Sequence, residues 1–473
     1  MKFLYIIAAL SVGVPASLRA QNSDTLHLSL EAAVQRAMAT GDEANLANAQ
    51  VQVADAQVTT ARAAALPQLA LSGTYSHVYE NARANAVGSI FNQPNTYNVN
   101  ANLSQPLFQG GRVLAGLRAS GSTRAAAQLN RAETRAQIAF DMQRAYLDAL
   151  LAARLLQIQE ANLEQSRAQL AQVELFEKSG RASRYEVLRA RVQQTNVQPL
   201  VIQAGSAREF ALLEVKRLAN LPMEQPLVLT TVLDTAAVQR VVAAVSASSG
   251  TGDRRGSVRA AGELAEAREA AVRVARADLF PSLSLTLRTG YQAFPRENGL
   301  PPGFGRLERV ECAPGSDPAR ICTEQNGGFF ADRAIGIQVS WPIFGGLRTK
   351  GSIDLAQAQQ RVARLELARE REAVRLEVAS ARNALAAAQA VFNAQRQNVG
   401  EAQEAFRLAN LRFSRGLSTQ LEVNDAQIAL LTAEINQARA VYDLYLAAAE
   451  LARALGDPIP LPDGGVVAPA LNR

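Results

Sequence analysis

The chain has 473 residues, and hydrophobic residues make up 48% of them but aromatic residues only 5%. Its apolar content is therefore mostly alanine, leucine and valine, which favours close-packed helices over a sandwich core of aromatic and β-branched side chains. The formal net charge of +6 comes from acidic and basic residues interspersed along the chain. Such a pattern is typical of a solvated surface and excludes the clustered positive footprint of a nucleic-acid-binding protein.

Residues 1–20 are predicted to be a secretory signal peptide. Lys2 provides a positive start, an apolar run follows over residues 3–10, and small residues precede Ala20, as in a cleaved signal. A retained transmembrane helix is the alternative, but the run is well short of the ~20 apolar residues that span a bilayer. No cysteine follows the candidate cleavage site to carry a lipid anchor. The mature chain is therefore expected to be exported.

The strongest feature of the sequence is an internal duplication. The segment around Pro106 resembles the segment around Pro342, and these two prolines are 236 positions apart. Gly180 and Gly416 are also 236 positions apart, so both halves run 74 residues between the two landmarks. The predicted organisation is a signal peptide, a first repeat over 21–219, an irregular linker over 220–255, a second repeat over 256–455 and an irregular tail over 456–473.

Each repeat is predicted to contain one very long helix. An apolar seam with the 4–3 spacing of a heptad repeat recurs in register in the two copies. Its members are Ile138, Met142, Ala145, Ala149, Ala152, Leu156, Leu163, Leu170 and Val173, and then Val374, Val378, Ala381, Leu385, Ala388, Phe392, Val399, Phe406 and Ala409. A helix of ~65 residues is ~100 Å long. No compact core needs that length, so the helix must cross a distance.

A shorter helix is predicted to return antiparallel to each long helix, at about 184–219 and about 419–455. The turns are expected at the two glycines, because glycine suits the left-handed C-terminal cap of a helix. Ser183 and Ser418 are the candidate N-caps of the return helices.

The other end of each repeat is predicted to be a β-hairpin, over about 68–106 and about 281–342. Apolar and polar residues alternate over ~10 residues in each strand, as in tilted membrane-spanning strands. The prolines of these hairpins are expected at strand ends, because proline breaks the ladder inside a strand. Pro67 and Pro281 mark strand entry, and Pro106 and Pro342 mark strand exit.

The loop of the second hairpin, at about 293–332, is expected to be extracellular, since long loops of outer-membrane barrels face outward. It contains Cys312 and Cys322, the two cysteines of the chain. In an exported protein this spacing predicts a disulfide that closes a short loop. Free thiols and metal binding are the alternatives.

Four spanning strands cannot close a membrane barrel, because open strand edges leave backbone groups unpaired in lipid. Closed barrels begin at ~8 strands, so the chain is expected to share a barrel with copies of itself. Three copies provide ~12 strands around a cyclic axis. The predicted fold class is mainly α with a membrane β-barrel part: a trimeric β-barrel continued by a periplasmic α-helical coiled-coil barrel.

The chain resembles the TolC-type outer membrane factor family over nearly all of its mature length. The resemblance rests on Ser-Leu-Glu-Ala-Ala at 29–33, the Pro-x-Phe strand exits, the two glycine turns and the Glu-Val-x-x-Ala segments that begin at Glu186 and Glu422. It implies a homotrimer in outer membrane lipid with a long periplasmic extension. It also implies docking to a periplasmic adaptor (membrane fusion) protein and an inner-membrane RND or ABC transporter.

Glu422 and Asp425 are three residues apart and therefore share one helix face. By resemblance they match the acidic pair that forms a constricting ring at the periplasmic tip, where six carboxylates would favour cations. Glu186 belongs to the same expected constriction, but Arg189 replaces the second acid in the first copy. The alternative is an ordinary solvated helix face.

The resemblance also implies that the helical turns dock the adaptor. The residues concerned are Gly180, Arg181, Gly416 and Leu417. Simple helix-turn chemistry is the alternative for each glycine. In the family, links among a basic, an aromatic and an acidic residue tie the closed tip. The corresponding positions here are Ser418, Phe413, which lacks a hydroxyl, and Glu186, and Arg181, Arg184 and Arg415 are nearby substitutes for the basic residue.

Trp341, beside Pro342, is predicted to mark the membrane–periplasm interface, or alternatively to cap the helix below. His27 and His77 are isolated, and the sequence has no nucleophile elbow, phosphate loop or metal cluster. No enzymatic activity and no cofactor are therefore predicted. Small-molecule efflux is the preferred function. The alternatives are the outer component of type I protein secretion and a non-conducting periplasmic coiled-coil protein.

Overall fold

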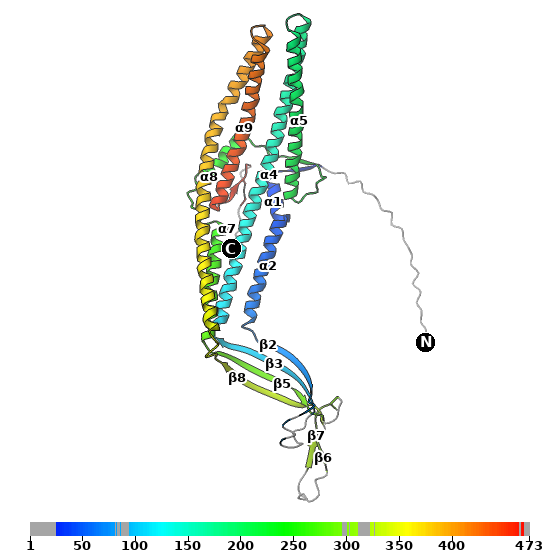
Figure 1. Cartoon of the computed structure of the whole chain (residues 1–473), viewed down its shortest axis with the longest axis vertical. Coiled ribbons are helices and arrows are strands. Elements are labelled where there is room, and N and C mark those ends of the chain that lie inside the picture. The colour runs from blue at the N-terminus through cyan, green and yellow to red at the C-terminus, as the bar shows by residue number, and fades with distance from the viewer. Residues whose placement is uncertain are drawn as a thin grey trace, which may run out of the picture.

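A computed structural model describes residues 25–80, 82, 86, 94–295, 300–301, 303–310, 322–325, 327–462 and 465–467. The molecule is an elongated rod with two helical hairpins at one end and a β-sheet at the other (Figure 1). The helices are α1 (Leu30–Thr40), α2 (Asp42–Ala63), α4 (Arg112–Lys178), α5 (Arg184–Leu218), α6 (Thr235–Ser246), α7 (Gly256–Arg276), α8 (Arg348–Ser414) and α9 (Gln420–Leu455). The strands are β1 (Leu26–Leu28), β2 (Gln68–His77), β3 (Asn95–Gln109), β4 (Leu227–Leu229), β5 (Ser282–Ala293), β6 (Leu307–Val310), β7 (Cys322–Gln325), β8 (Phe330–Ser340), β9 (Ile459–Pro460) and β10 (Val466–Val467).

The duplication is visible in the two longest helices. α4 and α8 each have 67 residues, and both their first and their last residues differ by 236 positions. The heptad seam explains this length: Met142 and Val173 on α4 and Val374 and Val378 on α8 are at most 3% exposed, and the regular 4–3 spacing keeps one apolar stripe facing the neighbouring helices. Among the described residues, no helix combines the length and apolarity needed to cross a bilayer.

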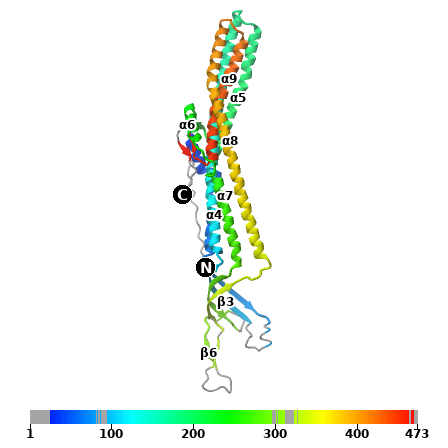
Figure 2. The ribbon, with the colours of Figure 1, turned by 90° about the vertical axis from the view of Figure 1, so that its left-hand side faces the viewer.

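A small mixed layer lies against one side of the rod at mid-height (Figure 2). Strand β1 pairs in parallel with β4, and the fully buried Tyr146 hydroxyl of α4 donates to the Leu28 carbonyl at 2.8 Å and accepts from the Thr231 N–H at 3.1 Å. The segment around β4 is therefore tied to the core by a side chain that no local pattern reveals, because the bonds join residues far apart in the sequence.

The prediction of an irregular linker over 220–255 is wrong. The segment contains β4 and the helix α6, whose N-cap Asp234 accepts from the Ala237 N–H at 2.6 Å. Val238, Val241, Val242 and Val245 form the buried stripe of α6, a helical pattern that the serines and glycines after it obscured. The tail over 456–473 is likewise not wholly irregular, since β9 and β10 pair in it.

The sheet is antiparallel, in the order β2-β3-β5-β8. Its register places apolar side chains on one face and polar ones on the other. The apolar face holds Leu69, Leu71, Tyr75, Tyr97, Val99, Leu103, Leu285, Leu287, Tyr291, Ile335, Ile337 and Val339. The polar face holds Ser72, Thr74, Asn98, Asn100, Asn102, Ser104, Ser284, Thr286, Arg288 and Gln338.

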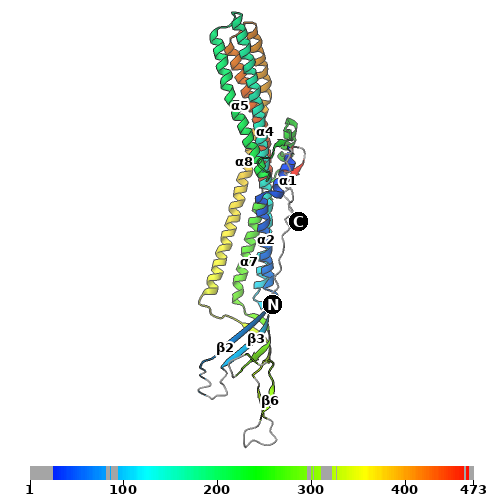
Figure 3. The same ribbon diagram turned by 90° about the vertical axis from the view of Figure 1, so that its right-hand side faces the viewer.

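The prediction that Pro106 marks a strand exit is wrong, because β3 continues to Gln109. The register against β5 shifts between Pro106 and Phe108, so a bulge accommodates the missing N–H of the proline. Pro67 and Pro281 directly precede β2 and β5. Within the described chain β2 and β8 are edge strands. Next to β8, the lower half of α8 diverges from α7, as Figure 2 and Figure 3 both show.

Candidate functional site

The two helical hairpins end in the same turn. Gly180 and Gly416 have φ values of +75° and +72°, a conformation in which glycine avoids the strain of a Cβ atom. The Arg181 N–H donates to the Phe176 carbonyl at 2.8 Å, and the Leu417 N–H donates to the Arg412 carbonyl at 2.9 Å. Both are the six-to-one bond of a Schellman motif. Helix-ending chemistry thus accounts for both glycines.

Two of the three candidate constriction carboxylates cap helices. Glu186 accepts from the Ser183 N–H at 2.6 Å, and Ser183 accepts from the Glu186 N–H at 3.3 Å. Glu422 and Thr419 form the same reciprocal capping box at the start of α9. The N-cap of α9 is therefore Thr419, and the prediction of Ser418 is wrong. The Ser418 hydroxyl instead donates to the Ala409 carbonyl at 3.4 Å. A capping box satisfies N–H groups that the first helical turn leaves without partners.

Asp425 is the carboxylate of this group that no cap occupies. It lies one helical turn after Glu422, is exposed, and makes no ion pair with any described residue. Glu422, by contrast, lies 4.0 Å from the Arg412 guanidinium, with 48% of its side chain exposed. Of the acidic pair, Asp425 therefore carries the less compensated charge.

An apolar cluster joins the tips of the two hairpins. Val173 and Val187 from the first hairpin are buried with Phe413 and Val423 from the second, and the rings of Phe176 and Phe413 lie 5.8 Å apart. The contact explains why an aromatic residue without a hydroxyl stands at position 413: its ring fills the space between the hairpins.

The arginines near the tips divide between two tasks. The Arg181 guanidinium lies 4.5 Å from the centre of the Phe176 ring and donates to the Ser414 carbonyl at 3.3 Å, which bridges the two hairpins. Arg184 lies 3.6 Å from Glu177 within its own hairpin. The bridge formed by Arg181 does not use Ser418.

Sequence reasoning missed a layer of buried amides between α4 and α9. Gln169 donates to Asn424 at 3.1 Å, and Gln427 donates to Asn162 at 2.7 Å and lies 3.3 Å from the Ser166 hydroxyl. Asn162, Ser166 and Gln169 follow heptad spacing on α4, which is the signal that reveals this layer. Polar bonds at a helix seam select one register, because a shifted neighbour leaves the amides unsatisfied.

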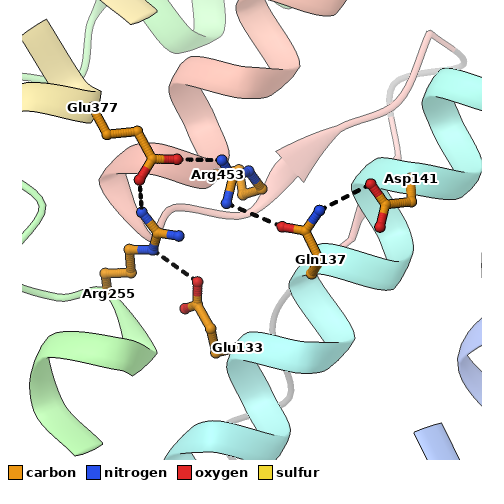
Figure 4. Close-up of polar contacts among 6 residues, drawn as sticks. All are labelled: Glu133, Gln137, Asp141, Arg255, Glu377 and Arg453. Atoms are coloured by element: carbon orange, nitrogen blue, oxygen red, sulfur yellow. Dashed lines mark hydrogen bonds and ion pairs between the residues drawn. The ribbon is translucent and has the colours of Figure 1, made fainter. Parts of the chain in front are cut away.

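A charged network joins four helices at mid-height (Figure 4). Arg255, at the N-cap of α7, donates to Glu133 of α4 at 2.7 Å and also binds Glu377 of α8. Arg453 of α9 binds Glu377 and donates to Gln137 of α4 at 3.1 Å. The Arg255 side chain is only 11% exposed. Its charge is compensated by both carboxylates, so the network holds α4, α7, α8 and α9 together.

The network perturbs the titration of its members. Burial alone would raise the pKa of Glu377, but the hydrogen bonds and charges of Arg255 and Arg453 outweigh it and lower this pKa below its usual value. Burial would likewise lower the pKa of Arg255, but its bonds to Glu133 and Glu377 raise it. Glu377 and Arg255 therefore both stay charged over the physiological range.

The remaining candidates are scattered. The Trp341 indole N–H donates to the Leu279 carbonyl at 3.3 Å, beside a hollow of about 320 Å³ between the sheet and α8. His27 lies in β1, and His77 Nδ1 lies 2.7 Å from Asn95 Oδ1. Cys312 and the side chain of Cys322 lie outside the described residues, and so does the predicted disulfide. The described residues contain no group of three side chains arranged to hold a metal ion.

Several solved structures are similar to this chain in fold. The outer membrane protein VceC of Vibrio cholerae is 20% identical, with a TM-score of 0.72 and coverage of 90% of this chain and 96% of that chain. The CmeC outer membrane channel of Campylobacter jejuni is 17% identical, with a TM-score of 0.72 over 90% and 85% of the two chains. The MtrE outer membrane channel of Neisseria gonorrhoeae is 20% identical, with a TM-score of 0.67 over 90% and 89%.

The likeness to these three structures establishes the fold of the chain. No curated protein matches the chain in sequence. The sequence model of the outer membrane efflux protein family, however, matches residues 28–221 and 251–457. This match covers both repeats and most of the chain, and the chain therefore belongs to the outer membrane efflux protein family.

Proposed function

We propose that three copies of this chain form an outer membrane channel that is the passive exit duct of a tripartite efflux system for small molecules. The single observation that carries the proposal is the four-stranded sheet with one apolar face and two open edges, β2 and β8. Such edges are stable in lipid only when other strands pair with them. Three sheets of this kind supply the strands of one closed barrel.

The internal duplication supports a specific pairing between copies. Within the chain, β3 of the first repeat pairs with β5 of the second, and Ala101 faces Thr289. The equivalent pairing joins β8 of one copy to β2 of the next, so that Ile337 faces Tyr75 and Trp341 faces Leu71. This register keeps apolar side chains on the same face of both strands. It also explains why β8 is shorter than β3: residues 341–344 lack the partner that their equivalents in β3 have.

The helices carry a matching set of unpartnered apolar side chains. Those on α5 include Tyr185, Leu188, Val192, Ile202, Phe210 and Leu213. Those on α8 include Leu355, Val362, Leu365, Leu376, Val391 and Leu408. Within the chain, α9 packs against α4, so the equivalent contact between copies joins α5 to α8. The rods then continue the barrel as a tube into the periplasm.

The periplasmic tip is the proposed selectivity site. Asp425 from three copies forms the acidic constriction, flanked by Glu422 and, in the first repeat, by Glu186. The latter two also cap their helices. Gly180, Arg181, Gly416 and Leu417 lie at the far end of the rod, and Leu417 is 66% exposed. These four residues are the proposed contact with a periplasmic adaptor, which couples the duct to an inner-membrane RND or ABC transporter. The signal peptide at 1–20 is proposed to direct the export of the chain.

Planar-bilayer recording tests the channel and the constriction separately. We expect the purified protein to give single-channel currents that prefer cations. Asp425→Asn should shift the reversal potential in a salt gradient toward zero, since three charges leave the aperture. Glu372→Gln removes an exposed acid on α8 far from the tip and is the matched control. A water-soluble monomer without bilayer activity refutes the channel; unchanged selectivity in Asp425→Asn refutes only the constriction.

A further inference from the structure

The two repeats are related residue by residue, with one offset on each side of the hairpin. The helices after the hairpin, α4 and α8, are offset by 236 positions. The helices before it, α2 and α7, begin at Asp42 and Gly256 and are offset by 214. The N-cap residues Gly41 and Arg255 share one backbone conformation, with φ and ψ of −64° and 144° against −57° and 140°.

In the described chain, the junction between the repeats is held by the contact of α4 with the start of α7. A Cβ atom built on Gly256 would lie 3.1 Å from the Cβ of Glu133. Beside this close approach, Arg255 bridges Glu133 to Glu377 (Figure 4). The order of charges across the junction is therefore acid on α4, base at the N-cap of α7 and acid on α8.

The junction between one copy and the next has a different set of charges. Under the two offsets, Glu133 corresponds to Arg369 on α8, Arg255 to Gly41 of the neighbouring copy, and Glu377 to Asp141 of that copy. The bridging arginine is thus missing, and glycine leaves its place open. On the other side of the junction, the base Arg369 stands where the acid Glu133 stands in the first repeat. Opposite charges therefore still face each other, because the basic residue has moved from the N-cap of the shorter helix to the long helix.

The surfaces that would meet have opposite charge. The first turn of α2 carries Asp42 and Glu43, and a hollow of about 600 Å³ beside it is lined by Glu43, Asp141, Asp148 and Glu214 together with Arg144 and Arg217. Arg369 is exposed on α8 and makes no ion pair with any residue in the described part of the chain. The acidic rim therefore has an excess of negative charge, and Arg369 has a positive charge without a partner.

We propose that Arg369 of each copy binds the acidic rim formed by Asp42 and Asp141 of the next copy, and that this ion pair replaces the Arg255 bridge at the boundary between subunits. The inference rests on the proposed trimer and adds its mid-height contact. The occupant of the rim is a second copy of this chain, because the repeat relation supplies both the position and the charge. A channel with three such boundaries has three intramolecular Arg255 bridges alternating with three intermolecular Arg369 pairs.

Disulfide trapping tests the position of this contact. In a Cys312→Ser/Cys322→Ser background, Asp42→Cys/Arg369→Cys places two thiols at the equivalents of Gly256 and Glu133. Boiled, non-reducing SDS gels should then show covalent dimers and trimers that dithiothreitol returns to monomers. Glu133→Cys/Gly256→Cys is the internal control and should close a disulfide within one chain. Asp42→Cys/Arg361→Cys, about 12 Å away along the helix, should give no crosslinked species.

Charge reversal tests the ion pair. Arg369→Glu should lower the temperature at which the trimer dissociates in SDS, and adding Asp42→Arg should restore part of the loss; Arg371→Glu, an exposed neighbour on α8, should change it little. If native trimers form and the internal control crosslinks but Asp42→Cys/Arg369→Cys does not, the contact is refuted and the channel stands. If native mass spectrometry finds only monomers, the proposed function fails as well.

Discussion

Replacing Arg255 with alanine should destabilise the molecule more than any surface arginine does. The change removes two charge-assisted hydrogen bonds and leaves Glu133 and Glu377, whose side chains are 22% and 31% exposed, without their shared partner. Breaking a fully buried pair costs about 3–5 kcal/mol. Partial exposure and the remaining bond from Arg453 to Glu377 reduce this, so the expected loss is about 2–3 kcal/mol.

The assay is thermal unfolding in detergent, followed by circular dichroism at a helix-sensitive wavelength. The roughly 410 residues that the structure describes correspond to an unfolding entropy of about 0.9 kcal/mol per kelvin, so Arg255→Ala should lower the midpoint by about 2–3 °C. Arg407→Ala is the control, because Arg407 forms an exposed pair with Glu404 three residues earlier on the same helix. Equal midpoints for the two variants would show that the network does not hold the four helices together.

Two further predictions use the same measurement. The pKa of Glu377 is lowered in the folded protein, so its stabilising charge is fully present above the unfolded pKa near 4.5 and is lost as the pH falls through the folded value. Wild type should therefore lose stability on acidification more steeply than Glu377→Gln. Parallel pH profiles for the two proteins would contradict this. Leu347 has a φ of +68°, and its equivalent Gly111 has a φ of +83°. A positive φ strains leucine but not glycine, so Leu347→Gly should raise the unfolding midpoint and Gly111→Leu should lower it, each by about 1 °C. Shifts of the opposite sign would show that another contact determines this backbone conformation.

The sequence alone was sufficient to predict the repeating architecture, because that architecture follows from local periodicity. The heptad seam through Met142 and Val378, the turn glycines Gly180 and Gly416, and the period-two strands each report the direction of neighbouring side chains within one element. The N-cap at Ser183 follows from the same local chemistry. The equally plausible cap at Ser418 was wrong by one residue, because Thr419 is the residue whose spacing completes a capping box with Glu422.

Tertiary structure alone decided which polar residues are structural and which are available for function. Arg255 is 122 positions from both Glu133 and Glu377, and Gln169 is 255 positions from Asn424. No periodicity within one element encodes such pairs, since they depend on how separate helices lie against each other. The structure likewise assigned Glu186 and Glu422 to helix caps and left Asp425 exposed. Residues that local patterns make equivalent thus differ in their charge balance, because long-range packing determines their neighbours.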